Sequence, residues 1–177
     1  FYGFLAGEAS QYEPTLTRNT SAVIQHPKKG YHLSEDIAED AIRWLREQRA
    51  YAPDKPFFMY WAPGASHGPH HIMKEWADRY KGKFDDGWDK YRERAFANAK
   101  AKGWIPQNTK LTPRPASMAS WDSIPEAEKP FQRRLMEVFA GFVEHVDVQA
   151  GRVIDELDRL GIRDNTLVLV LSDNGAS

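Results

Sequence analysis

The sequence lacks cysteine, and it lacks any long apolar segment. None of its 177 residues is a cysteine, so disulfides, thiolate zinc sites and cysteine nucleophiles are excluded. The longest apolar runs have five or six residues, whereas a membrane-spanning helix needs roughly 20. With 24 basic and 25 acidic side chains, the formal charge is −1, and no basic surplus indicates a nucleic-acid partner. The sequence therefore predicts no membrane span and no nucleic-acid partner.

Phosphate-binding glycine loops are also missing, because neither G-x-x-x-x-G-K-[ST] nor G-x-G-x-x-G occurs. A chain of this length predicts a single domain with a sizeable core. The sequence begins at Phe1 and not at a methionine. Its first residues therefore do not indicate whether the protein is cytoplasmic, periplasmic or secreted.

Helical and strand-like patterns alternate along the chain. Ser34 is expected to cap a helix over about 34–50, and a second helix is expected over about 126–160, ending at Gly161. Two continuous apolar runs, 57–61 and 166–171, are typical of strands buried on both faces of a parallel sheet. Residues from about 72 to 125 are expected to form a surface excursion with one or two helices, broken near 82–87. The pattern predicts an α/β fold in which helices cover both faces of a sheet.

Polar side chains follow both predicted strands. A loop with His67, His70 and His71 comes after the first strand, and Asp173 and Asn174 come after the second. Parallel strands would bring the two groups to one edge of the sheet, where open α/β sheets bind ligands. The Asp-Asn pair suits Ca²⁺ or Mg²⁺, although it could also be an ordinary turn. The histidines could bind a metal, transfer protons or lie on the surface without a role.

Other polar residues are expected to be structural. The long helix carries charged side chains that we expect to form a solvated face, namely Glu137, Glu144, His145 and Asp147. His26 and His32 belong to no histidine cluster like that of the loop and are assigned no role.

Several of these segments together resemble the sulfatase family, in the alkaline phosphatase superfamily. Residues 157–175, LDRLGIRDNTLVLVLSDNG, resemble the family's strand and metal motif, and residues 53–71, PDKPFFMYWAPGASHGPHH, resemble the preceding strand and histidine loop of arylsulfatases. Residues 1–12 and 74–93 are similar to one arylsulfatase branch. The resemblance covers essentially the whole chain and implies a single partial sulfatase catalytic domain over 1–177.

The resemblance implies a hydrolase that cleaves sulfate esters. In that family, a cysteine or serine in a C/S-x-P-x-R motif is oxidised to formylglycine, the nucleophile, and a divalent cation, usually Ca²⁺, holds the sulfate. By the same resemblance, Asp173 and Asn174 are metal ligands, and His67 binds the ester near its leaving oxygen. Nothing carries over to His70 or His71.

The chain departs from the family pattern at the nucleophile. Its one S-x-P-x candidate, Ser123 to Ala127, has alanine where arginine is needed and lies too far downstream. We therefore expect an internal fragment that is inactive alone and whose partners are a sulfate ester and the remaining segments of the parent domain. Two alternatives are a phosphodiesterase or phosphonate monoester hydrolase of the same superfamily, and a degenerate binding module.

Overall fold

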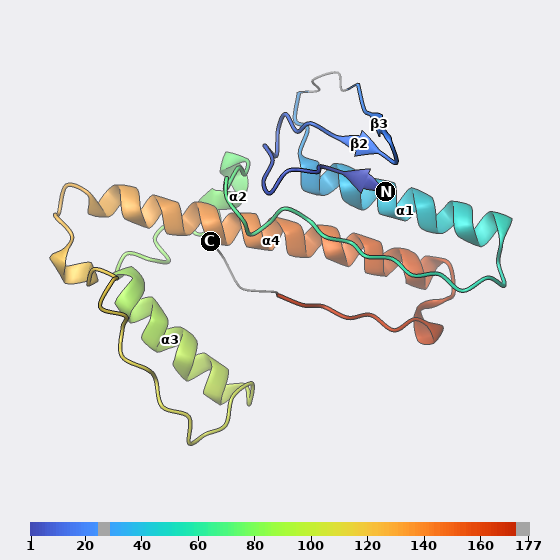
Figure 1. The fold of residues 1–177 in the computed structure, drawn as a ribbon. Coiled ribbons are helices and arrows are strands. Elements are labelled where there is room, and N and C mark those ends of the chain that lie inside the picture. The colour runs from blue at the N-terminus through green and yellow to red at the C-terminus, as the bar shows by residue number, and fades with distance from the viewer. Residues whose placement is uncertain (25–28, 173–177) are drawn as a thin grey trace.

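The computed structural model describes residues 1–24 and 29–172, which combine helices with a small antiparallel sheet (Figure 1). Two long helices form the frame: α1 spans Leu33–Tyr51 and α4 spans Lys129–Arg159. The shorter helices are α2 (Lys74–Asp78) and α3 (Gly87–Ala101), with 3-10 turns η1 (Trp121–Ser123) and η2 (Arg163–Asn165). Among the described residues, no helix has both the length and the hydropathy that a membrane span requires.

The helix α1 forms where apolar periodicity predicted it, but its N-cap differs. Ile37, Ala41 and Leu45 are buried along one face, which packs against α4. The predicted cap, Ser34, lies inside the helix, and His32 is the N-cap residue, because its ring nitrogen accepts a hydrogen bond from the Ser34 backbone N–H. The N-terminus of α1 is thus capped by a buried imidazole, whereas the sequence predicted capping by a serine hydroxyl.

The helix α4 is continuous over 31 residues and ends as its sequence predicted. Gly161 follows the last helical turn with φ of 66°, the left-handed conformation that glycine adopts without strain. Its N–H donates to the Asp158 carbonyl, and the Ile162 N–H donates to the Leu157 carbonyl, both at 3.0 Å. These two bonds form the Schellman motif that closes a helix.

The only strands among residues 1–24 and 29–172 are three short ones near the N-terminus. They are β1 (Tyr2–Gly3), β2 (Thr17–Arg18) and β3 (Ser21–Ala22), paired antiparallel in that order. The sheet carries Leu16 and flanking apolar side chains onto α1, where they form a core with Leu33 and Ile37.

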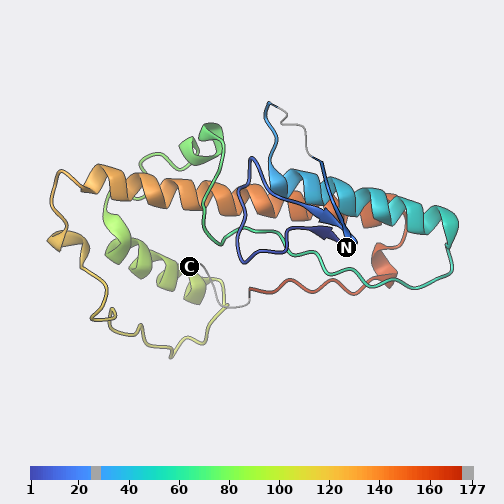
Figure 2. The ribbon, with the colours of Figure 1, turned by 45° about the horizontal axis from the view of Figure 1, so that its top comes forward.

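The two predicted core strands are present only as extended, unpaired segments. Residues 57–61 and 166–171 run in the same direction along α4 in both ribbon views (Figures 1 and 2). Phe58 and Leu171 are 87% and 84% exposed, so the expected burial on both faces is not reached. The α/β prediction is thus met only in part, because a parallel strand needs a hydrogen-bonded neighbour and neither segment has one among the described residues.

The excursion between the two long helices contains α2 and α3, as the break near 82–87 predicted. The backbone N–H of Gly87 donates to Phe84, and Gly87 has φ of 79°. The chain then leaves the α1–α4 frame as an arm made of α3 and the loop that follows it (Figure 1).

Candidate functional site

The candidate site begins in the loop that follows residues 57–61. The backbone N–H of His67 donates to the Gly64 carbonyl at 3.0 Å, which makes a tight turn. Its side chain stays 54% exposed, with Nδ1 2.8 Å from the Gly68 carbonyl and 3.9 Å from the Glu8 carboxylate. A carbonyl can only accept, so Nδ1 is the donor in this bond. Nε2 is left as the nitrogen that can exchange a proton with a ligand.

The other two loop histidines have structural contacts. His70 packs edge-on against Phe139, with ring centroids 5.2 Å apart, and its Nε2 donates to the Ser66 carbonyl at 3.2 Å. His71 stacks on Tyr12 at 5.3 Å. Packing thus holds His70 and His71, and His67 is the most exposed of the three loop imidazoles.

The loop also contains a serine pattern that the sequence analysis did not use. Residues 64–68 read Gly-Ala-Ser-His-Gly, which matches the G-x-S-x-G of a nucleophile elbow. An elbow needs a helix directly after the serine, whereas the next helix here starts only at Lys74. No hydrogen bond joins the Ser66 hydroxyl to a histidine among the described residues. The geometry therefore argues against Ser66 as an activated nucleophile.

The predicted metal ligands Asp173 and Asn174 lie outside the described residues. The description ends at Ser172, which is exposed at the end of the 166–171 segment. Within residues 1–24 and 29–172, no group of three or more histidine, aspartate or glutamate side chains is placed to hold a metal. Their meeting with His67 therefore remains a prediction.

A buried polar cluster lies between α1 and α4, where a solvated helix face was expected. His145 is fully buried, and its Nε2 is 3.0 Å from the Glu35 carboxylate. Its ring lies 4.4 Å from that of His32. Glu137 is also buried, and it accepts a hydrogen bond from the Gly82 N–H. The prediction of a solvated face was wrong for these two residues, because α1 and α2 cover this side of α4.

His32 gives this cluster a pH dependence. Its Nδ1 accepts from the Ser34 N–H, so its hydrogen is on Nε2, which donates to the His71 carbonyl at 3.0 Å. Burial, reinforced by the neighbouring His145, lowers the pKa of His32 to about 4. The Glu35 carboxylate and the bond to the His71 carbonyl oppose that shift without cancelling it. The folded chain therefore holds His32 neutral near pH 7.

We expect the free energy of unfolding to be highest above about pH 6.5 and to fall by about 2–3 kcal/mol as the pH drops toward 4. In this window the unfolded chain takes up a proton on His32 and the folded chain does not. Denaturant titrations between pH 7 and pH 4 measure this slope. His32→Asn keeps a capping side chain and should flatten it, whereas the exposed control His67→Asn should leave it unchanged. Equal slopes in all three proteins would contradict this account.

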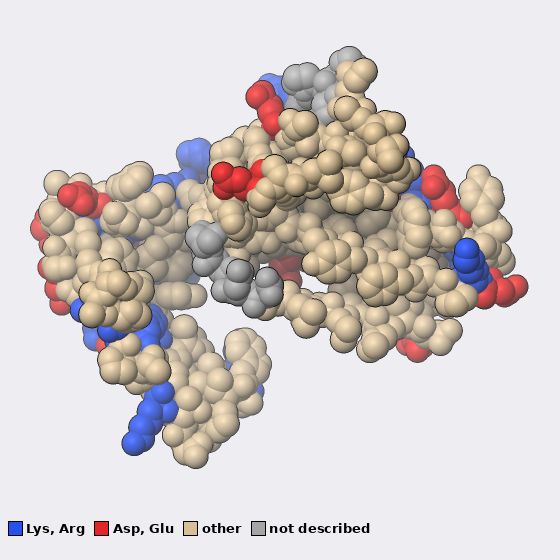
Figure 3. Space-filling view, in the orientation of Figure 1, with Lys and Arg blue, Asp and Glu red and all other residues tan. Residues whose placement is uncertain are grey.

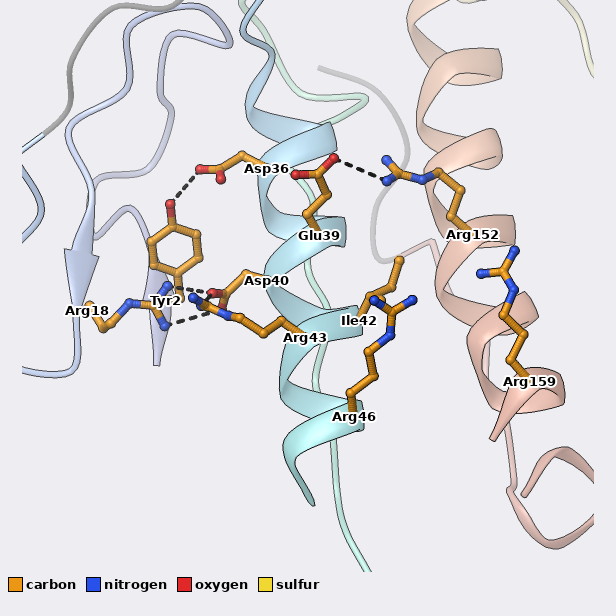
Figure 4. A pocket seen from close by; sticks show the side chains of 10 residues that line it. All are labelled: Tyr2, Arg18, Asp36, Glu39, Asp40, Ile42, Arg43, Arg46, Arg152 and Arg159. Atoms are coloured by element: carbon orange, nitrogen blue, oxygen red, sulfur yellow. Dashed lines mark hydrogen bonds and ion pairs between the residues drawn. The ribbon is translucent and has the colours of Figure 1, made fainter. Parts of the chain in front are cut away.

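An arginine-rich groove of about 670 Å³ lies beside this cluster, between the β1–β2 strands, α1 and α4 (Figure 4). Every arginine that lines it has an acidic partner. Arg46 contacts the buried Glu156 at 2.8 Å, Arg159 contacts Glu156 at 3.2 Å, and Arg152 contacts Glu39 at 3.3 Å. Arg18 and Arg43 share Asp40. The groove is therefore an ion-pair network that joins the two long helices and the sheet.

The helical frame and the small antiparallel sheet form a mixed helical and β structure, and the loop after the extended residues 57–61 carries the accessible imidazole of His67. The sulfatase family model matches residues 1–177, and the chain belongs to the sulfatase family.

Relatives of this chain carry the same family name. It is 36% identical over 166 residues to an uncharacterized sulfatase of Schizosaccharomyces pombe. The aligned region covers 92% of this chain and 29% of that protein. It is 29% identical over 147 residues to an arylsulfatase of Klebsiella aerogenes, covering 83% of this chain and 31% of that protein. The chain thus spans less than a third of the length of these two curated relatives.

Proposed function

We propose that this chain is part of the catalytic domain of a sulfuric ester hydrolase of the arylsulfatase type. The family match over residues 1–177 supports this, and one observation carries the assignment of a site: His67 is accessible while His70 and His71 are held by packing. In the complete domain, residues 57–61 and 166–171 would be strands of an alkaline-phosphatase-like sheet with helices on both faces.

In this proposal His67 acts on the leaving group of the ester. The bond from Nδ1 to the Gly68 carbonyl fixes the ring, and a protonated Nε2 can then donate to the oxygen that leaves from sulfur. An imidazole is the side chain best suited to exchange a proton near neutral pH. The exposed position of the ring leaves room for an ester beside it.

The donor chemistry of Asp173 and Asn174 fits a hard divalent cation, Ca²⁺ or Mg²⁺, since both side chains offer oxygen atoms. These two residues would hold the cation together with ligands from outside this chain. When bound, the cation would polarise the sulfate oxygens and offset developing negative charge. The nucleophile, a formylglycine by family resemblance, would also come from outside residues 1–177.

The test measures hydrolysis of 4-nitrophenyl sulfate by the complete protein, compared with a phosphate diester and a phosphonate monoester. We expect the sulfate ester to have the highest kcat/KM and the 177-residue chain alone to show no turnover. His67→Ala should lower kcat/KM by about a hundredfold or more, because a positioned proton donor is lost. The control His70→Gln should lower it much less.

Three results would contradict the proposal in different ways. A higher kcat/KM for the phosphate diester or the phosphonate would favour the related hydrolases of the superfamily. No turnover by the complete protein would favour a degenerate binding module. Turnover by the purified 177-residue chain would show that the nucleophile lies within it.

A further inference from the structure

The arm that leaves the α1–α4 frame concentrates positive charge. Residues 94–121 contain no aspartate or glutamate, in a chain whose formal charge is −1. The same segment carries five basic residues, namely Arg94, Lys100, Lys102, Lys110 and Arg114. A stretch of 28 residues with charge of one sign makes a local positive potential that the overall charge of the protein conceals.

The arm has a defined conformation, because the loop after α3 folds back along the helix and is hydrogen-bonded to it. Arg92 donates to the Thr112 carbonyl at 2.7 Å, and the Gln107 amide donates to the Lys100 carbonyl at 2.7 Å. At the base, Trp88 donates to the Ala119 carbonyl at 3.1 Å and packs edge-on against Trp121 at 4.8 Å. The lysines are therefore presented on a preformed surface.

The five basic residues of 94–121 divide into two groups. Arg94 and Arg114 are paired with Asp86 and Asp89 at the base of the arm. Lys100, Lys102 and Lys110 have no carboxylate partner among the residues that the structure describes. We call these three residues the arm lysines. Blue side chains project from the lower end of the arm in Figure 3.

An exposed indole lies among the arm lysines. Trp104 is 72% exposed, and the Lys102 ammonium is 4.4 Å from the centre of its ring. A flat apolar ring beside a cation suits a ligand that alternates flat C–H surfaces with anionic groups. Both extended segments run toward the end of the molecule that carries the arm (Figures 1 and 2). A long ligand held on the arm could therefore extend toward the segment ends at which the active site is proposed.

We propose that the arm binds a polyanionic carbohydrate that carries several sulfate esters, and so holds a polymeric substrate for the proposed sulfatase site. That the anions are sulfate esters rests on the proposed function. That the arm binds a polyanion rests on the positive charge of the arm. A nucleic acid fits less well, since one exposed indole offers no series of stacking positions. An anionic membrane also fits less well, because only Gly87 of α3 is buried and the helix has no broad apolar face.

The test compares two triple variants of the complete protein, each of which removes three lysine charges. The first replaces the arm lysines, K100Q/K102Q/K110Q. The control, K29Q/K55Q/K81Q, replaces exposed lysines elsewhere. Binding to dextran sulfate, uncharged dextran, single-stranded DNA of equal charge and phosphatidylserine vesicles is measured at low and moderate salt. Hydrolysis of 4-nitrophenyl sulfate is measured in the same preparations.

We expect the arm variant to bind dextran sulfate at least about tenfold more weakly and with a smaller salt dependence, since each lysine facing a polyanion contributes to affinity. The control should change affinity less than threefold, and uncharged dextran should not bind measurably. Equal losses in both variants would overturn the proposal. Equally tight, lysine-dependent binding of DNA or vesicles would overturn the assignment to carbohydrate.

Hydrolysis of the small ester separates this inference from the proposed function. The arm variant should keep the kcat/KM of the unmodified protein for 4-nitrophenyl sulfate, because the arm lysines are not part of the proposed active site. If the unmodified protein does not hydrolyse the small ester, the proposed function fails while the binding data still report on the arm. Loss of hydrolysis in the arm variant alone would contradict a purely binding role.

Discussion

Replacing Asp173 with asparagine in the complete protein is expected to lower kcat/KM for an aryl sulfate by about a thousandfold. The change keeps the size of the side chain and removes the negative charge of the proposed ligand pair Asp173 and Asn174. A cation that holds the sulfate oxygens stabilises charge as it develops in the transition state, and loss of one such interaction costs about 10²–10³ in rate. Loss of the cation itself should cost more.

Metal content distinguishes this explanation from a folding defect. Elemental analysis should find less Ca²⁺ or Mg²⁺ in Asp173→Asn, and added cation should restore part of the rate. Asp164→Asn is the matched control, because it makes the same chemical change in the exposed turn before residues 166–171. Full activity and full metal content in Asp173→Asn would remove Asp173 from the proposed site.

Gly141→Ala is expected to lower the free energy of unfolding by about 1–2 kcal/mol, and Gly151→Ala to raise it by up to about 1 kcal/mol. Both glycines lie inside α4. A methyl group on Gly141 would lie 2.7–2.8 Å from the backbone of Trp76 and Ala77, where α2 crosses α4. A methyl group on Gly151 meets nothing within 4 Å. Backbone cannot rotate away as a side chain can, so α2 would have to move.

Denaturant titrations of the two glycine variants measure this difference directly. Alanine has a higher helix propensity than glycine at both positions, so propensity alone predicts two stabilised proteins. Opposite signs would show that close packing of α2 on Gly141 outweighs helix propensity. Stabilisation of both variants would mean that α2 does not lie against Gly141 in solution.

Local patterns in the sequence predicted the helices well. Buried apolar residues repeat along α1, and a glycine in the left-handed conformation ends α4, so both features depend on neighbours within a few residues. The break between α2 and α3 also follows from local glycine chemistry. These features need no knowledge of the rest of the fold.

Long-range features were predicted less well. The apolar runs 57–61 and 166–171 indicated strands, but pairing needs neighbouring strands, and none lies beside them among the described residues. His145 was placed on a solvated face because it is polar. Phe142 lies three residues before His145 and Gln149 four residues after it, so all three share one face of the helix. This spacing could have predicted that His145 is buried. The roles of His67, Asp173 and Asn174 stay predictions, and the last two residues lie outside the described residues.

Two contacts between α1 and α4 each join residues 110 positions apart, Arg46 with Glu156 and Glu35 with His145. The entropy lost in closing such a loop grows only with the logarithm of its length, so doubling the loop costs only about 0.6 kcal/mol more. The free energy of pairing the two long helices therefore depends little on the number of residues that connect them. Evolution can lengthen, shorten or recharge the arm, and thereby change what the protein recognises, while the helical frame keeps its stability.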